Sequence, residues 1–167
     1  MRNILIKHLS TFTSICYNII SMNKGVDKME DIELAIKNLY EDDYTFVAAK
    51  DGQIIFKSSE KGIKPMYRFV TEIKERAKDA SIADRVIGRG AALLASTLGI
   101  REIYAELISK EGIDVLKEHD IPYAYDVLCN YIKNKDRTDY CPIEKLSMGV
   151  EDPSIILRKL ENFFNKK

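Results

Sequence analysis

The chain has 167 residues, of which 46% are hydrophobic and 31% are charged. This length and composition fit one globular domain with a sizeable core, and they exclude a disordered or fibrous protein. The formal net charge is zero, so no overall basic field would draw the protein to nucleic acid or to an anionic membrane. No apolar run reaches the roughly 18 residues that a membrane helix needs. Three scattered cysteines, Cys16, Cys129 and Cys141, argue against a disulfide framework, so we expect a reducing, cytoplasmic location.

The first 28 residues differ from the rest of the chain because they hold four basic residues and only one acidic residue. A secretory signal peptide is disfavoured, since polar residues break the apolar part and no small-residue cleavage site follows. The codons of Lys24-Gly25-Val26 can resemble a bacterial ribosome-binding sequence, with Met29 as the start codon behind it. We therefore expect residues 1–28 to be an extension outside the fold and residues 29–167 to form one α/β domain.

Regular patterns begin at Met29. Apolar residues at helical spacing, among them Ile32 and Leu39, predict an amphipathic first helix. Two β-rich runs then flank Asp51-Gly52, a pair that tolerates the positive φ angles of a tight turn. This part of the sequence predicts a helix followed by a β-hairpin.

The remaining segments alternate between helical and strand patterns. Strands separated by helices imply crossover connections and a sheet with helices on both faces. The predicted order is helix 66–78, helix 81–96, strand 101–108, helix 109–119, strand 121–127, a short helical turn from Pro142 and a last helix from Asp152-Pro153.

Three segments resemble the bacterial family called domain of unknown function 1893: GIKP at 62–65, ADRVIGRGAA at 83–92 and CPIEKL at 141–146. The resemblance extends over most of the chain from Met29 to about Phe164. It implies a cytidine-deaminase-like fold, which is a three-layer α/β/α sandwich whose mixed sheet here includes the N-terminal hairpin. The family has no established activity, so the resemblance implies a fold and no reaction.

Zinc-dependent deaminases need a His or Cys with a nearby Glu at one helix start and Pro-Cys-x-x-Cys at another. The corresponding segments, 83–85 and 109–112, contain neither His nor Cys. We therefore predict no metal and no cofactor, and we disfavour zinc-dependent deamination. Gly88-Arg89-Gly90 is not interpreted as a dinucleotide fingerprint, because we expect it inside a helix rather than at a strand-to-helix turn.

Asp84, Arg85, Gly88 and Arg89 form the first candidate site. In the predicted helix, residues four apart lie close together, so two guanidinium groups would gather beside Asp84 and suit a phosphate or carboxylate. Gly88 would leave room for the ligand. The alternative is structural: a helix cap at Ser81, small residues that allow close packing, and arginines that face water.

Cys141 and Glu144 form the second candidate site. Pro142 at a first helical position would place Cys141 at the N-cap, where the helix dipole favours a thiolate. Glu144 would oppose that effect, and a nucleophilic cysteine also needs a base. The alternative is a capped turn with a small buried thiol.

These patterns support three functions. The first is a zinc-free, deaminase-like domain that binds a small anionic or nucleotide-like ligand. The second is a regulatory or self-association module, such as a homodimer formed through the last helix or a sheet edge. The third is a cysteine-dependent transferase that uses Cys141, which becomes credible if the two candidate sites converge.

Overall fold

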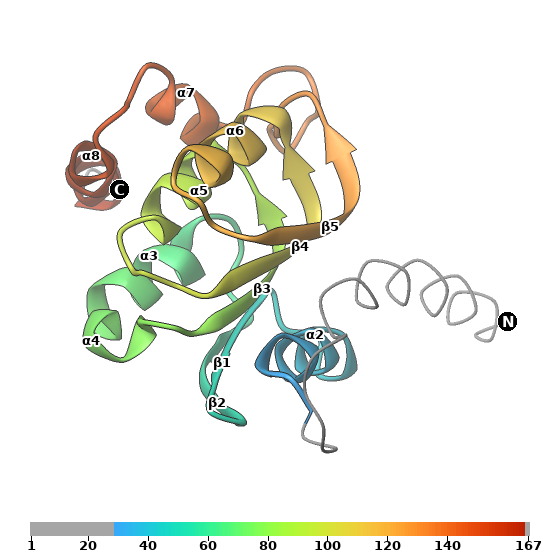
Figure 1. Cartoon of the computed structure of the whole chain (residues 1–167). Coiled ribbons are helices and arrows are strands. Elements are labelled where there is room, and N and C mark those ends of the chain that lie inside the picture. The colour runs from blue at the N-terminus through green and yellow to red at the C-terminus, as the bar shows by residue number, and fades with distance from the viewer. Residues whose placement is uncertain (1–28, 166–167) are drawn as a thin grey trace, which may run out of the picture.

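The structure is a computed structural model in which residues 29–165 are described (Figure 1). The predictions about residues 1–28 fall outside this part of the chain. The elements are α2 (Asp31–Glu41), β1 (Phe46–Lys50), β2 (Gln53–Ser58), α3 (Lys64–Glu72), α4 (Lys74–Ala77), β3 (Ser81–Ile87), α5 (Arg89–Ala95), β4 (Glu102–Ser109), α6 (Lys110–Glu118), β5 (Tyr123–Cys129), α7 (Pro142–Ser147) and α8 (Pro153–Asn165).

Five strands form one open, mixed sheet in the order β2-β1-β3-β4-β5. Strand β1 is antiparallel to both β2 and β3, whereas β3, β4 and β5 run parallel to one another. The predicted hairpin is confirmed: Asp51 and Gly52 join β1 to β2 with φ angles of 54° and 77°. These positive angles are the reason for the Asp-Gly pair, since they carry a steric cost for most other residues.

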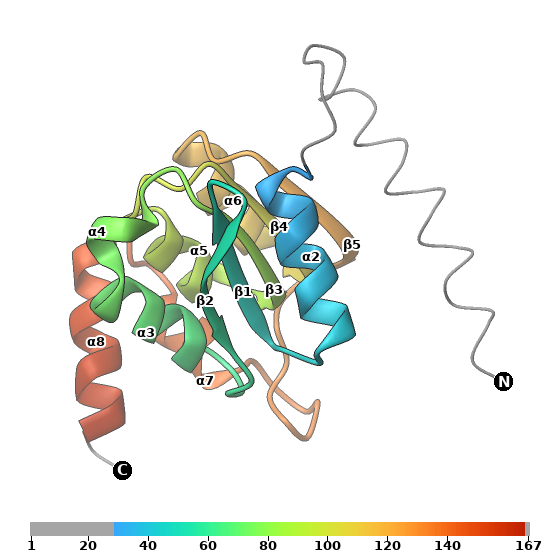
Figure 2. The same ribbon diagram turned by 90° about the horizontal axis from the view of Figure 1, so that it is seen from below.

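The sheet has a buried apolar surface on each face. Along β1, Phe46 belongs to one core and Val47 to the other, because successive side chains of a strand point to opposite faces. Helix α2 packs on the face of Val47, where Leu39 is fully buried. The larger core lies on the face of Phe46 and includes residues of α3, α5, α6 and α8. Figure 2 shows α2 on one side of the strands and these helices on the other.

The predicted helix over 81–96 is wrong. Residues 81–87 form β3, which is paired with β1 on one side and β4 on the other, and only residues 89–95 are helical. A strand buried on both faces reads as a continuous apolar run, which periodicity alone does not separate from a buried helix. Gly88-Arg89-Gly90 therefore lies at a strand-to-helix turn. The dinucleotide pattern is still incomplete, since Leu93 stands where its third glycine would be.

The later elements follow the predicted order with small shifts of their ends. Ser109 is the N-cap of α6, and its Oγ accepts a hydrogen bond from the backbone N of Gly112 at 3.0 Å. Segment 66–78 is split by Ile73 into α3 and α4. None of the helices within residues 29–165 has the length and apolar character needed to cross a membrane.

Candidate functional site

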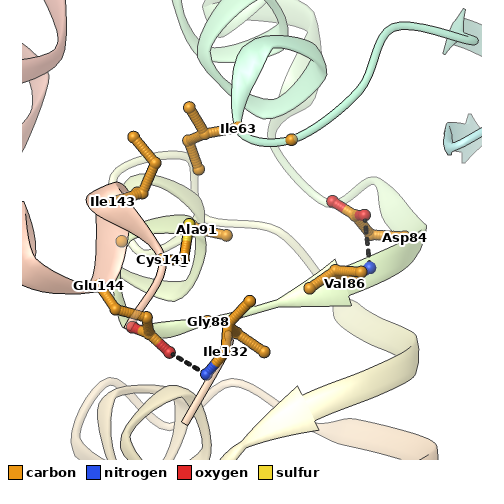
Figure 3. A pocket seen from close by; sticks show the side chains of 11 residues that line it. Ile63, Asp84, Val86, Gly88, Ala91, Ile132, Cys141, Ile143 and Glu144 are labelled. Atoms are coloured by element: carbon orange, nitrogen blue, oxygen red, sulfur yellow. Dashed lines mark hydrogen bonds between the residues drawn. The ribbon is translucent and has the colours of Figure 1, made fainter. Parts of the chain in front are cut away.

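A pocket of about 80 Å³ opens where β3 ends and α5 begins (Figure 3). Five segments that are far apart in the sequence form its walls: the turn before α3, the end of β3, the start of α5, the segment after β5, and α7. Most of the wall is apolar. The lining residues are Gly62, Ile63, Asp84, Val86, Gly88, Gly90, Ala91, Ile132, Cys141, Ile143 and Glu144.

Asp84 supplies a buried acid to this pocket. Its exposed fraction is 7%, and its Oδ1 accepts a hydrogen bond from the backbone N of Val86 at 3.0 Å. No ion pair within residues 29–165 involves Asp84. Burial therefore raises the pKa of Asp84 from 3.8 to about 7, although backbone N–H groups of Val86 and Arg85 oppose this shift. The carboxyl is divided between its protonated and ionised forms at neutral pH.

Glu144 is the second carboxyl group of the pocket, and it has a structural role. It is 4% exposed. Its Oε2 accepts a hydrogen bond from the backbone N of Arg89 at 3.0 Å, and its Oε1 accepts one from the backbone N of Ile132 at 3.1 Å. One side chain of α7 thus joins the start of α5 to the segment that follows β5. Because both oxygens accept backbone hydrogen bonds, Glu144 is poorly placed to act as a catalytic base.

The glycines at the start of α5 allow this close packing. A Cβ atom on Gly88 would lie 2.9 Å from Oε1 of Glu144 and 3.0 Å from Cγ1 of Ile132. A Cβ atom on Gly90 would lie 2.7 Å from Cγ2 of Ile143. Gly88 does line the pocket, but the space it leaves is filled by Glu144 and Ile132.

The two arginines of the first candidate site are held elsewhere. Arg85 reaches the α2 face of the sheet, where it binds Glu106 at 2.6 Å and donates to backbone oxygens of Leu39 and Tyr44. It also lies over the ring of Tyr40, at 4.6 Å from the centroid. Successive residues of a strand alternate between faces, so Asp84 and Arg85 point in opposite directions.

Arg89 holds the C-terminal part of the chain. Its guanidinium donates to the backbone oxygens of Ser147 and Val150, at 3.0 and 2.7 Å. Neither arginine lines the pocket, so the expected pair of guanidinium groups beside Asp84 is not formed. The single helix expected over 81–96 would have brought the two guanidinium groups together, but this segment forms strand β3 and the short helix α5.

Cys141 lies at the N-cap of α7, as predicted from Pro142. It lines the same pocket as Asp84, Gly88 and Glu144, so four of the six predicted site residues come together. Within the described part of the chain, no His, Lys or Arg lines the pocket. Among residues 29–165, no three His, Cys, Asp or Glu side chains gather in a way that could hold a metal ion.

Comparison with known proteins shows which family this chain belongs to. The profile described as Domain of unknown function (DUF1893) matches residues 34–164. This chain belongs to the DUF1893 family. The crystal structure of a DUF1893 family protein from Thermotoga maritima is similar, with 25% identity and a TM-score of 0.75 over 84% of this chain and 100% of that chain. Among curated proteins, none matches.

Sequence reasoning missed the apolar walls of this DUF1893 pocket. Ile63, Ile132 and Ile143 come from a turn, a connection and a short helix, and none of these segments carries a periodic signal that reveals its neighbours. GIKP at 62–65 and CPIEKL at 141–146 were singled out for their resemblance to the family. Both segments contribute residues to the pocket, whereas Ile132 lies outside them.

Proposed function

We propose that this DUF1893 domain binds a small organic molecule with an apolar body and a protonated amine, and that the amine lies beside Asp84. The observation that carries the proposal is a buried carboxyl group, without an ionic partner among residues 29–165, on the wall of a largely apolar pocket. A carboxylate in such a place is costly unless an opposite charge accompanies it. A bound ammonium group would supply that charge.

The size and the charge of the pocket both bear on the ligand. A volume of about 80 Å³ has room for several water-sized groups, so the part of the ligand that enters the pocket is small. The anionic ligand expected from the sequence depended on Arg85 and Arg89, and both are bound to other parts of the protein. Among residues 29–165, two carboxyl groups and no basic side chain line the pocket, which favours a cation.

We retain the cytidine-deaminase-like, three-layer α/β/α description as a proposal about the fold. The mixed sheet, its N-terminal hairpin and the position of α2 opposite the other helices support it. The pocket lies at the carboxyl ends of the parallel strands, which is a common ligand position in open α/β sheets.

The test is a screen of small amines, alcohols and carboxylates by protein-observed NMR, which follows the amide signals of Val86, Arg89 and Ile132. We expect amines to shift these signals, and we expect Asp84→Asn to weaken their binding about tenfold or more through loss of the charge. Asp136→Asn, which changes an exposed loop carboxylate, is the matched control. Amine affinity should rise as the pH increases through about 7, because the ionised form of Asp84 binds the cation. Preferential binding of carboxylates, or equal amine affinity in Asp84→Asn, would refute the proposal.

Cysteine-dependent group transfer is a second candidate, favoured by the position of Cys141 and Asp84 on one pocket. A thiolate there would share the pocket wall with two carboxyl groups, and no basic side chain among residues 29–165 lines the pocket. The rate at which iodoacetamide alkylates Cys141, measured by peptide mass spectrometry, distinguishes group transfer from amine binding. Cys141 that reacts faster than a free peptide thiol supports transfer, and Cys141 that reacts more slowly leaves amine binding as the function.

A further inference from the structure

We propose that β5 is a self-association edge and that two copies of this chain pair their β5 strands antiparallel, so that the two five-stranded sheets join into one.

The outer edge of β5 has no partner strand within residues 29–165, because β5 is the last strand of the sheet and pairs only with β4. An unpaired edge presents backbone donors and acceptors that a further strand can satisfy. Figure 1 shows β5 at the side of the molecule away from α8 and α4.

The apolar side chains of β5 are unusually exposed. Tyr125, Val127 and Leu128 have exposed fractions of 41%, 53% and 44%. Since side chains alternate along a strand, Tyr125 and Val127 point to one face and Leu128 to the other. Both faces of this edge would therefore gain buried apolar area when another strand is added.

Features that normally protect an edge are present on β2 and missing from β5. Strand β2 has a register irregularity opposite Ala48 and Ala49 and an exposed lysine, Lys57. Strand β5 has no lysine and no proline. Its one charged side chain, Asp126, accepts hydrogen bonds from the hydroxyl groups of Tyr104 and Tyr40. This carboxylate is thus held by the protein's own α2 face.

Charge identifies a second copy, in antiparallel orientation, as the occupant. Before β5, the exposed charged residues of 117–120 are Lys117, Glu118 and Asp120, with a net charge of −1. After the strand, those of 133–137 are Lys133, Lys135, Asp136 and Arg137, with a net charge of +2. Antiparallel pairing of β5 with β5 brings the acidic segment of each copy toward the basic segment of the other. Parallel pairing would bring like charges together, which is unfavourable.

The twofold symmetry also restricts the register. Residues opposite each other must point to the same face, so the axis lies between one residue of β5 and the same residue of the other copy. An axis at Asp126 would place two carboxylates opposite each other, which is unfavourable. The axis therefore lies at another residue of β5, and Tyr125 and Val127 are the two nearest the centre of the strand.

Sedimentation velocity of the full chain over a range of concentrations tests the proposal. We expect the wild type to form dimers, and we expect Val127→Lys to weaken dimerisation about tenfold or more because a lysine on the edge opposes pairing. Met148→Lys is the matched control, since Met148 is an apolar residue of similar exposure, 44%, outside the sheet. Circular dichroism verifies that both variants are folded.

Hydrogen exchange at low and high protein concentration distinguishes strand pairing from another contact. We expect amides of 123–129 to gain protection in the dimer of the wild type and of Met148→Lys. A monomeric wild type, an unweakened Val127→Lys dimer, loss of the dimer in Met148→Lys, or a dimer without added protection in 123–129 would each overturn the proposal.

Discussion

At the scale of single residues, Asp84 couples the stability of the fold to pH. Its pKa is about 7 in the folded chain against an ordinary value of 3.8, because burial disfavours the charged form. The folded chain therefore holds this proton more tightly than the unfolded chain. The stabilisation is complete below about pH 4 and is lost as the pH rises through about 7.

Asp84→Asn should remove this dependence, since the amide keeps an acceptor for the backbone N of Val86 and carries no charge. Between about pH 5 and about pH 8, we expect the unfolding free energy of the wild type to fall by roughly 3 kcal/mol relative to that of the variant. Urea unfolding of both proteins at the two pH values measures this difference. Parallel pH profiles would show that Asp84 is not the group responsible.

Gly88 and Glu144 form a coupled pair. Gly88→Ala would place a methyl group 2.9 Å from Oε1 of Glu144, and we expect a loss of about 1–3 kcal/mol of stability through overpacking. Glu144→Ala should also destabilise the fold, because the backbone N–H groups of Arg89 and Ile132 lose their acceptor.

In the double variant the clash with the carboxylate is absent. A double-mutant cycle by urea unfolding should therefore give a coupling energy of about 1 kcal/mol. Gly88→Ala should lower the unfolding free energy less in the Glu144→Ala background than in the wild type. Strict additivity would mean that the methyl group is accommodated without moving Glu144.

At the scale of elements, the sequence predicts the helices, strands and turns that have a local sequence signal. It does not predict a strand whose structure depends on the strands that pair with it. The Asp51-Gly52 turn is predictable because it needs positive φ angles that few residues adopt. The helix starts at Pro142 and Pro153 are predictable because proline has a fixed φ that suits the first turn of a helix. Segment 81–87 has small and apolar residues that fit a helix as well as a central strand. Its β structure is determined by β1 and β4, which come from other parts of the chain.

Helix α2 is joined to the hairpin by one buried carboxylate. Asp31 is 8% exposed, and its two oxygens accept hydrogen bonds from the backbone N–H groups of Asp51 and Gly52 at 3.0 and 2.7 Å. Asp31→Ala would leave both N–H groups without this acceptor. We expect a loss of about 2–3 kcal/mol in unfolding free energy.

The control is Lys37→Ala on the same helix, which changes an exposed side chain and should alter stability by no more than about 0.5 kcal/mol. Chemical denaturation of the two variants gives the comparison. If they were equally stable, the bonds between α2 and the turn would contribute nothing to the fold.

At the scale of the whole molecule, the candidate site is a product of chain topology. The residues that line the pocket lie between Gly62 and Glu144, so they are spread over about half of the chain. No local sequence pattern indicates that the segment after β5 returns to α5. The sequence therefore predicted several of the residues that line the pocket but not the apolar residues between them. The charged groups of the pocket could not be predicted either, because they depend on which face each arginine of β3 and α5 reaches.

The two cores should unfold together because the same strands build both. In β4, Ile103 belongs to the larger core and Tyr104 to the core under α2, so neither core can lose its strand residues without the other. Leu39→Ala in the smaller core and Leu94→Ala in the larger one should each cost about 2–5 kcal/mol, since both side chains are fully buried. In each variant, the urea midpoints from far-UV circular dichroism and from tyrosine fluorescence should coincide. Separate midpoints in Leu39→Ala would instead mean that α2 detaches from a sheet that stays folded.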